Sequence, residues 1–230
     1  MKAMILAAGR GERMRPLTDT TPKPLLEVGG KALIAWIIEA LVTSGFRELV
    51  INVSHLGAQI ENALGRGNRW NASIQYSREA EPLETAGGIA TALPLLGSEP
   101  FIVVNADIYT DFDFARLRNV VLPHGSTRAH LVLVDNPAHH PDGDFALEGH
   151  AVYNAGPARH TFSGIGAYQP ALFHGIKPHT KAQLAALLRP QIDAGCVTGE
   201  HYSGSWSDVG TTERLAQIDV MLRRNYSFRR

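Results

Sequence analysis

A loop near the N-terminus carries cations at a spacing suited to a phosphate ligand. It follows an apolar segment at residues 3–6, which is typical of a buried strand, and it begins with small residues and glycines. Glycine allows close approaches that a Cβ would block, and the free N–H groups of such a loop bind phosphate oxygens. Four cations follow, Arg10, Arg13, Arg15 and Lys23, and prolines on both sides of Lys23 stiffen its segment. The sequence therefore predicts a polyphosphate-binding loop.

Two common phosphate-binding loops do not match this segment. Gly9 and Gly11 form a G-x-G pair, but Met14 stands where the dinucleotide fingerprint requires its third glycine. No G-K-[ST] sequence follows, so the segment is not a P-loop.

Two aspartates are candidate metal ligands. Asp107 follows an apolar run at residues 101–104, and Asp208 lies in the sequence W-S-D-V-G-T. An aspartate after a strand is just as often a turn or helix-capping residue. Carboxylates are nevertheless the ligands that Mg²⁺ prefers, and substrate phosphates complete its octahedron.

The string L-A-A-G-x-G-x-R-x-R-P-L-T at residues 6–18, followed by P-K-P-L at residues 22–25, resembles the signature of the sugar-1-phosphate nucleotidyltransferases. The resemblance implies that the backbone of residues 6–9 meets the nucleoside, that residues 11–13 surround the triphosphate, and that Lys23 bridges phosphates. The nucleotide-binding residues that it implies are Leu6, Ala8, Gly9, Gly11, Glu12, Arg13, Lys23, Thr85 and Gly87.

The same resemblance implies the reaction. A phosphate oxygen of a sugar 1-phosphate attacks the α-phosphorus of a nucleoside triphosphate, and pyrophosphate leaves. Asp107 and Asp208 are expected to hold one Mg²⁺ ion, and the expected catalytic residues are Arg13, Lys23, Asp107 and Asp208. No general base is needed, because a phosphate monoester is largely dianionic at neutral pH. Arg10 and Arg15 either assist or are surface and ion-pair residues.

Residues 84–88, E-T-A-G-G, resemble the family's G-T-A-G segment, which contacts base and ribose. Glu84 replaces the usual first glycine. The alternative is that this segment is simply a helix start capped by Thr85 or Glu84, and the sequence leaves both interpretations open.

The sugar side is expected in the second half of the chain. The E-K-P element common in the family is missing, and Y-N-A-G-P stands there at residues 153–157. Arg159 is therefore either a replacement for the missing lysine or an exposed loop residue. The expected sugar-phosphate-binding residues are Asn105, Asp144, Glu148, Ser163 and Gly164.

Composition excludes several classes of protein. The chain has 230 residues, 44% of them hydrophobic, and equal numbers of basic and acidic side chains. This balance favours neither a nucleic acid nor a membrane surface as a partner. One cysteine, Cys196, excludes an internal disulfide framework. Without a signal sequence or a long apolar segment, we expect a soluble cytoplasmic protein that is a monomer or a small homo-oligomer.

Alternating strands and helices predict an α/β fold, a single Rossmann-like nucleotidyltransferase domain with a mostly parallel mixed sheet flanked by helices. We expect a nucleotide-binding half at residues 1–110 and a sugar-phosphate-binding half at 111–230, with no β-helix appended. Strands are predicted at residues 3–6, 49–53, 73–77, 101–104, 129–134, 145–147, 151–153, 162–168 and 196–202, and helices at 31–44, 55–64, 85–96, 180–194 and 211–225.

The short length, Glu84 and the missing lysine element together resemble a small uridylyltransferase branch of the family, for which the substrates are UTP and a sugar 1-phosphate. Mannose-1-phosphate guanylyltransferases are the nearest alternative. A glycosyltransferase using a nucleotide sugar, or a sensor without catalysis, would explain the sheet and Asp107. A glycosyltransferase with its diphosphate donor would not require the cations of the loop. A sensor without catalysis should have lost Arg13 or one of the aspartates, and all of these residues are present.

Overall fold

The central strand β1 (Ala3–Leu6) is buried on both faces in the computed structural model, which describes residues 1–120 and 127–227. Side chains alternate between the faces of a strand, so Ala3 and Ile5 enter one hydrophobic core and Met4 enters the other. The neighbouring strand β6 (Phe101–Asn105) alternates in the same way. A strand covered on both faces needs a continuous apolar sequence, which is why both strands could be predicted.

The main sheet is mixed, as expected. Its order is β5-β4-β1-β6-β11-β8-β12-β10-β9, with β5, β4, β1 and β6 parallel to one another. Strand β11 is antiparallel to both β6 and β8, and β9 pairs with β11 as well as with β10. The strands not yet given are β4 (Glu48–Val53), β5 (Ser73–Arg78), β8 (Ala129–Val134), β9 (Phe145–Glu148), β10 (Ala151–Tyr153), β11 (Arg159–Tyr168) and β12 (Val197–Tyr202).

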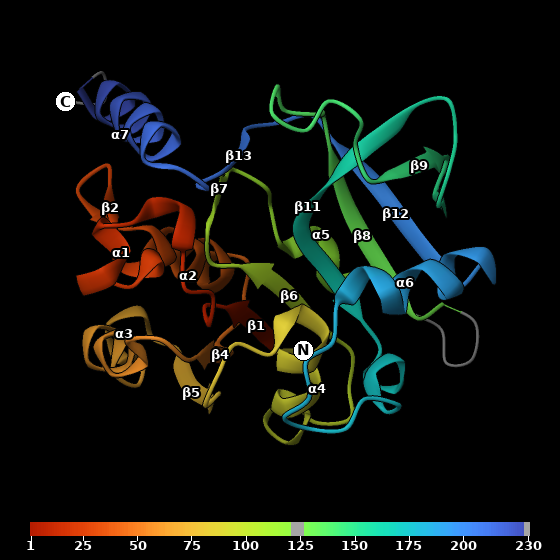
Figure 1. Cartoon of the computed structure of the whole chain (residues 1–230), viewed down its shortest axis with the longest axis horizontal. Coiled ribbons are helices and arrows are strands. Elements are labelled where there is room, and N and C mark those ends of the chain that lie inside the picture. Colours follow the sequence, from red (N-terminus) through yellow and green to blue (C-terminus); the bar gives the residue numbers. More distant parts are fainter. Residues whose placement is uncertain (121–126, 228–230) are drawn as a thin grey trace.

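Helices cover both faces of this sheet (Figure 1). Helices α2 (Leu33–Thr43) and α3 (Gly57–Leu64) contribute apolar side chains to the core on one face. Helices α4 (Glu84–Leu96) and α6 (Leu184–Asp193) do so on the other. Two short helices, α1 (Leu17–Thr20) and α5 (Ala115–Arg118), lie in connections. In the part of the chain that the structure describes, no helix is both apolar and long enough to span a bilayer.

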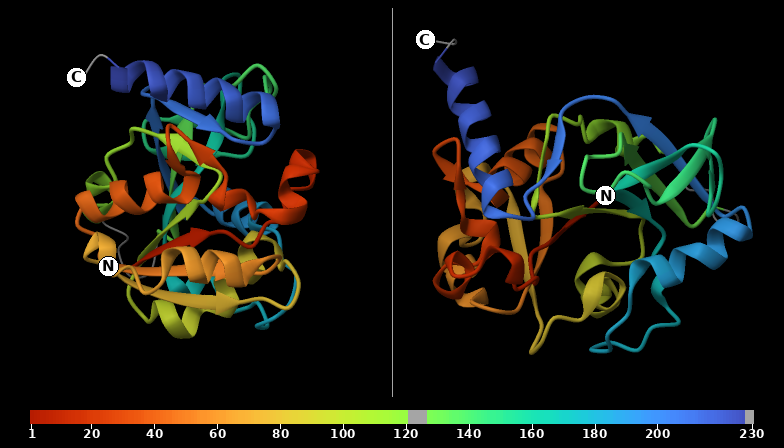
Figure 2. Two further views of the ribbon diagram at one scale, coloured as in Figure 1. Left: turned by 90° about the vertical axis from the view of Figure 1, so that its left-hand side faces the viewer. Right: turned by 45° about the horizontal axis from the view of Figure 1, so that its top comes forward.

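The C-terminal helix α7 (Thr212–Ser227) packs on the N-terminal part of the chain (Figure 2). Its Ile218 and Leu222 form a third core with Leu33 and with Val28 of the small hairpin of β2 (Glu27–Val28) and β3 (Lys31–Ala32). The N–H of Gly29 donates to Asp219 Oδ1 at 2.8 Å. This docking places the start of α7 beside residues 7–18, the predicted phosphate-binding loop, which we call the phosphate loop.

A second small pairing was not predicted. Strands β7 (Ile108–Thr110) and β13 (Trp206–Asp208) are antiparallel, with Asp208 opposite Ile108. Segments of three residues are too short to show a periodic pattern, so only the fold reveals that these distant parts of the chain meet.

The helix predicted at residues 180–194 is wrong at its start, because α6 begins at Leu184. The backbone of Ala182 forms hydrogen bonds with α4 and the residue before it, not with its own helix. Its N–H donates to the Leu83 carbonyl, and its carbonyl accepts the N–H groups of Ala86 and Gly87 at 2.9 and 3.1 Å. Extended backbone at residues 180–183 therefore closes the start of α4. Three other predicted helices also begin later than expected, at Leu33, Gly57 and Thr212.

We predict that Gly87→Ala destabilises the protein by about 2 kcal/mol, because a Cβ at this position would clash with the backbone carbonyl of Thr180. The free energy of unfolding in urea measures this. Gly175→Ala is the matched control, since a Cβ there has no atom within 4 Å, and it should leave stability unchanged or slightly raised. Equal stability of the two variants would contradict the packing role of Gly87.

Candidate active site

A cavity of about 570 Å³ lies at the carboxyl edge of the parallel strands, where ligand sites of such sheets are found. We call it the loop cavity. It joins the ends of β1 and β6 to the phosphate loop and to the segment before α4. Its lining includes Leu6, Ala8, Gly9, Gly11, Glu12, Arg13, Lys23, Thr85, Asn105 and Asp107, together with Ala7, Pro24, Asn52, Glu79, Pro82, Leu83, Glu84, Ala106 and Gly210.

Gly11 gives the phosphate loop its shape. Its φ of 70° lies in the left-handed region, and a Cβ would come within 3.0 Å of Thr18 Cγ2 and 3.2 Å of Lys23 Cβ. The Thr18 hydroxyl donates to the Gly11 carbonyl at 2.9 Å. The loop therefore folds tightly against Lys23. Arg15 takes no part in the cavity and instead pairs with Asp19 at 2.7 Å.

The base of the loop cavity is a buried polar network that sequence reasoning missed. Asn52, at the end of β4, accepts the N–H of Ala7 at 2.8 Å and donates to Glu79 Oε1 at 2.7 Å. The other oxygen of Glu79 accepts the N–H of Leu83 at 3.0 Å. The network thus connects the loop after β1 with the segment before α4. Gly88 leaves room for it, because a Cβ there would lie within 2.8 Å of Glu79 Oε1.

Burial raises the pKa of Glu79, although its hydrogen bonds to Asn52 and to the Leu83 backbone lower it in part. One signal in the sequence could have indicated this pair once the strand order was known. Asn52 and Glu79 stand at or just after the ends of neighbouring parallel strands, at the same edge as the phosphate loop.

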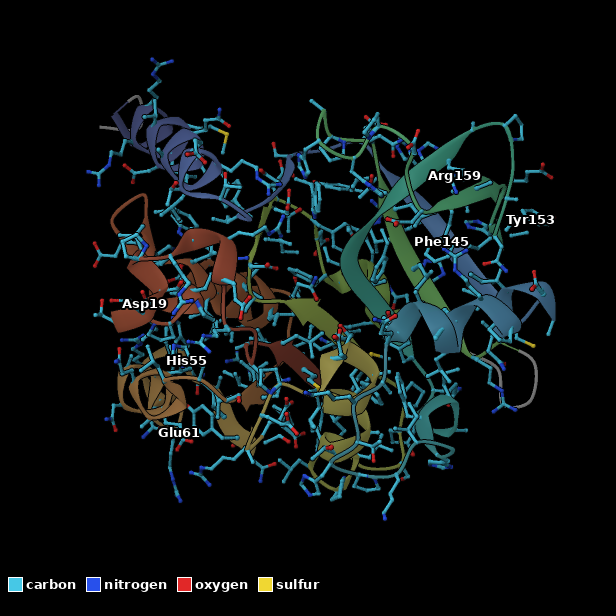
Figure 3. The ribbon with its side chains drawn as sticks, in the orientation of Figure 1. Asp19, His55, Glu61, Phe145, Tyr153 and Arg159 are labelled. Atoms are coloured by element: carbon cyan, nitrogen blue, oxygen red, sulfur yellow. The ribbon has the colours of Figure 1, made fainter. Side chains whose placement is uncertain are left out.

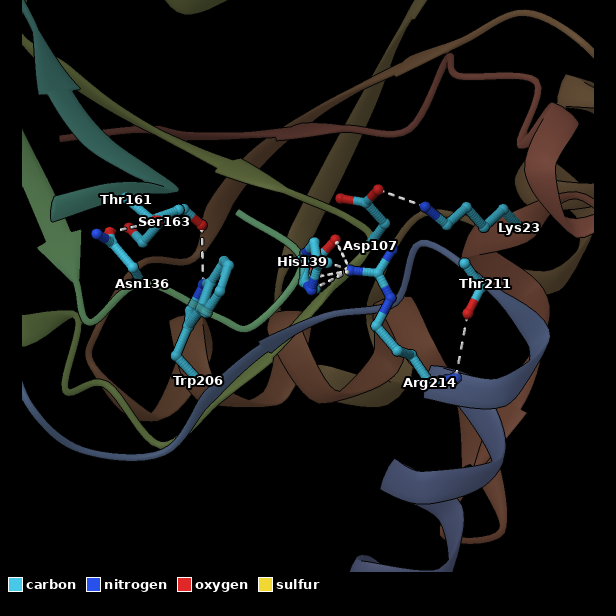
Figure 4. Close-up of polar contacts among 10 residues, drawn as sticks. Lys23, Asp107, Asn136, His139, Thr161, Ser163, Trp206, Thr211 and Arg214 are labelled. Atoms are coloured by element: carbon cyan, nitrogen blue, oxygen red, sulfur yellow. Dashed lines mark hydrogen bonds and ion pairs between the residues drawn. The ribbon is translucent and has the colours of Figure 1, made fainter. Parts of the chain in front are cut away.

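Lys23 lies on one side of the loop cavity and forms an ion pair with Asp107 Oδ2 (Figure 4). The lysine is only 8% exposed. An ammonium group this deeply buried needs a counter-charge, since an unpaired charge in such a place is strongly destabilising. The structure therefore couples the residue expected to bridge phosphates to one of the two expected metal ligands.

The second aspartate is held beside the first by the pairing of β7 with β13. The N–H of Val209 donates to the Asp107 carbonyl at 2.7 Å. The carboxylate of Asp208 contacts Arg214 Nη1 at 2.5 and 2.6 Å and His139 Nε2 at 3.1 Å. Arg214 comes from α7 and was not expected at the site (Figure 4). A Cβ on Gly210 would clash with its guanidinium and would lie 3.1 Å from Arg13 Nη2, so two arginines meet over this glycine.

Asp107 and Asp208 line a common cavity of about 380 Å³, which we call the acidic cavity. Arg13, Asn105, His139 and Ser163 line it too. Asp107 lies in the turn between β6 and β7, and Asp208 ends β13. Two hard oxygen ligands from distant segments, each facing a protein cation, suit a divalent ion that keeps open positions for water and phosphate. The donor set therefore fits the expected metal.

The third cavity, of about 320 Å³, lies between β11 and α6 and shares Leu6, Glu84, Thr85 and Asn105 with the loop cavity. We call it the α6 cavity. Asp144 and Gly164 line it as expected. The Asp144 carboxylate accepts the Phe162 N–H at 2.8 Å. Gly164 has a φ of 78°. Because glycine has no side chain, the Asn105 amide can pack directly against this residue.

Several expected residues lie elsewhere. Gly87 packs against residues 180–182 and lines none of the three cavities. Glu148 is exposed at the end of β9 and also lines none of them. Arg159 donates through Nε to the Asp142 carbonyl at 2.9 Å and does not line the α6 cavity. Arg189 from α6 supplies the cation there instead.

Glu84 has a φ of 61°, in the left-handed region where a glycine is favoured. This explains why a glycine is usual at this position of the motif. The helix-capping interpretation is wrong, because neither Glu84 nor Thr85 caps α4 with its side chain. The carbonyl of Ala182 satisfies the first free N–H groups of the helix.

The fold and this arrangement of loop, cations and aspartates are those of an enzyme that transfers nucleotidyl groups. The sequence model of the nucleotidyl transferase family matches residues 2–145, and the chain belongs to this family. It is 53% identical, over 96% of its length and 98% of the relative, to an N-acetylmuramate alpha-1-phosphate uridylyltransferase of Neisseria meningitidis. Enzymes of the family generally use a divalent metal ion.

One more distant relative and one solved structure are also similar to the chain. The catalytic subunit beta of a mannose-1-phosphate guanylyltransferase from Danio rerio is 31% identical over 91% of this chain, which spans 61% of that relative. A structure of a proposed glucose-1-phosphate thymidylyltransferase from Bacillus anthracis superposes with a TM-score of 0.86, covering 97% of this chain and 95% of that one at 20% identity. The expected fold class is confirmed.

We predict that the contribution of Glu79 to the free energy of unfolding decreases as the pH rises. The folded pKa of Glu79 is raised, so the native state binds this proton more tightly than the unfolded state does. The resulting stabilisation is complete below the unfolded pKa of about 4.3 and is lost as the pH rises through the folded value. The unfolding free energy of the parent protein minus that of Glu79→Gln should therefore decrease as the pH rises above about 4.3.

Urea unfolding at several pH values measures this difference. Glu99→Gln, which alters an exposed glutamate in the same way, is the matched control. A difference that increases with pH would show that the fold favours the Glu79 carboxylate and would contradict the dominance of burial.

Proposed function

We propose that this chain transfers UMP from UTP to N-acetylmuramate 1-phosphate, giving UDP-N-acetylmuramate and pyrophosphate, in the peptidoglycan recycling of the cytoplasm. The observation that carries this proposal is that the loop cavity and the α6 cavity meet at Asn105, beside Lys23 and the two aspartates. A triphosphate in one cavity and a sugar phosphate in the other would meet at that point. The identity of 53% to the Neisseria meningitidis relative supports these substrates.

In this proposal the two halves of the chain bind different substrates. Residues 1–110 would bind the nucleotide, with the backbone of Leu6, Ala8 and Gly9 against the nucleoside and the segment Gly11, Glu12 and Arg13 around the phosphates. Residues 111–230 would bind the sugar phosphate, with Asn105 at the boundary and Asp144, Ser163 and Gly164 beside the hexose. These residues line the three cavities, which supports the assignment.

The reaction needs positioning and charge stabilisation more than proton transfer. The attacking phosphate oxygen is already anionic at neutral pH, so no general base is required. Lys23 would bind the α-phosphate side, and Arg13 would stabilise the charge that develops on the leaving pyrophosphate. Asp107 and Asp208 would hold a Mg²⁺ ion, which when bound polarises the phosphate and reduces repulsion between the two anionic substrates.

The substrate proposed here has a carboxylate on a lactyl ether that N-acetylglucosamine lacks. The described residues that line the α6 cavity include two carboxylates, Glu84 and Asp144, and one cation, Arg189. The guanidinium of Arg189 lies 5.6 Å from the centre of the Phe145 ring, and Nη1 donates to Asn154 at 3.4 Å. We assign the lactyl carboxylate to Arg189, because a guanidinium binds a carboxylate through charge-assisted hydrogen bonds.

We predict that Asp208→Asn lowers kcat by about 10³-fold or more in the presence of Mg²⁺, because the metal-borne charge stabilisation is worth several kcal/mol. Pyrophosphate release measures kcat, and circular dichroism checks the fold. The matched control is Asp19→Asn, an exposed carboxylate that pairs with Arg15 (Figure 3) and should leave kcat unchanged. Normal turnover of folded Asp208→Asn would remove this residue from the metal site.

The substrate assignment is tested by kcat/KM for a panel of pairs: UTP with N-acetylmuramate 1-phosphate, UTP with N-acetylglucosamine 1-phosphate, and GTP with mannose 1-phosphate. The first pair should be preferred. Arg189→Met should lower kcat/KM for N-acetylmuramate 1-phosphate by about tenfold or more and change the value for N-acetylglucosamine 1-phosphate little, since a hydrogen bond to a charged group contributes about 1.5–3 kcal/mol.

Arg78→Met is the control for this substitution. Arg78 is exposed and pairs with Glu61, which lies far from Phe145 in Figure 3. Preference for GTP with mannose 1-phosphate would overturn the substrate assignment and leave the nucleotidyltransferase class in place. An equal loss for both sugars in Arg189→Met would overturn only the role of Arg189.

A further inference from the structure

Three metal-ligating side chains converge on neighbouring strands at a distance from the cavities described above. Asp135 directly follows β8, His160 lies on β11 and His201 lies on β12. Strand β8 pairs with both of the others, and the partners of Val134 are Thr161 and Tyr202. Strand β11 is antiparallel to β8, so His160 continues this register opposite Asp135. Strand β12 is parallel to β8, so His201 pairs with Leu133, two residues before Asp135 and therefore on the same side of the sheet.

The ligand atoms are close enough to share an ion. One carboxylate oxygen of Asp135 and one nitrogen from each histidine all lie within 4.8 Å of one another. His201 Nε2 is 2.9 Å from Asp135 Oδ1, and the two imidazole rings are 4.5 Å apart between centroids. Ligands at about 2.0–2.1 Å from a tetrahedral ion are separated by about 3.3 Å, so small side-chain rotations would complete the geometry.

We propose that Asp135, His160 and His201 bind one divalent transition-metal ion of the Zn²⁺ class, with water in the remaining position. Two imidazoles and one carboxylate are ligands suited to Zn²⁺ and to its neighbours Co²⁺ and Ni²⁺, whereas Mg²⁺ prefers oxygen ligands alone. The site shares no residue with the pair Asp107 and Asp208. Within residues 1–120 and 127–227 it is the one cluster of three such ligands at this spacing.

The position of the ion gives it a structural consequence for the active site. The neighbouring Asn136 donates to the carbonyls of Pro141 and Arg159 at 2.9 and 3.0 Å. It also accepts the Thr161 hydroxyl at 2.9 Å. The loop that starts there carries His139 to Asp208. An ion bound to Asp135 and His160 would therefore hold the end of β8 against β11, the two strands that anchor this loop.

The experiment uses the full chain, first stripped of metal with a chelator and then dialysed. Co²⁺ is added and followed by its visible ligand-field absorption, and thermal melting is measured with and without Zn²⁺. We expect one Co²⁺ ion per chain at this site, with absorption typical of a low-coordinate nitrogen and oxygen environment. Zn²⁺ should raise the Tm. His160→Ala and His201→Ala should each weaken Co²⁺ binding by about tenfold or more and abolish the Zn²⁺-dependent rise in Tm.

Two controls locate the binding. His174→Ala removes an exposed histidine outside the cluster and should leave the affinity unchanged. Asp208→Asn removes a carboxylate of the acidic cavity and should leave it unchanged too. The proposal is overturned if His160→Ala and His201→Ala bind Co²⁺ as tightly as the parent protein. It is also overturned if Asp208→Asn abolishes the absorption, because the ion would then lie in the acidic cavity.

Discussion

The pairing of β7 with β13 is the constraint on which the rest of the site depends. It joins the segment after β6 to the segment before α7, and so sets Asp208 beside Asp107 although the two residues come from opposite halves of the chain. The hydrogen bond from the Val209 N–H to the Asp107 carbonyl fixes the position of one aspartate relative to the other. The docking of α7 on β2 then delivers Arg214 to the same place. These two short strands thereby hold the two aspartates beside Lys23 and Arg214.

Those cations make the site electrostatically balanced within the protein itself. Lys23 neutralises Asp107, and Arg214 with His139 faces Asp208. Paired charges in a partly buried site are tolerated, whereas an uncompensated one is strongly destabilising. A divalent ion at the two carboxylates would replace protein cations as their partners, and the released cations would face the phosphates.

The loop cavity has a different kind of support. Asn52 and Glu79 are buried and hold the two backbone segments that form the floor of the loop cavity. Their network is satisfied on every side that the structure describes, but burial still raises the pKa of the glutamate. A polar network of this kind specifies one arrangement of the loops at some expense of stability. Gly88 shows how strictly the space is defined, since one added methyl would displace both side chains.

The sequence by itself determined the elements whose pattern is local. The apolar runs of β1 and β6 predicted central strands, and the spacing of Gly11, Arg13 and Lys23 predicted the phosphate loop, because strand burial and loop geometry leave their mark on adjacent residues. The tertiary structure alone decided the late start of α6 and the packing of Gly87 against residues 180–182. It also decided the contact of Arg214 with Asp208 and the presence of Arg189 and the Asn52–Glu79 pair in the cavities. Each of these depends on a contact between segments far apart in the chain, and such contacts are set by how the sheet and helices pack, which no local periodicity records.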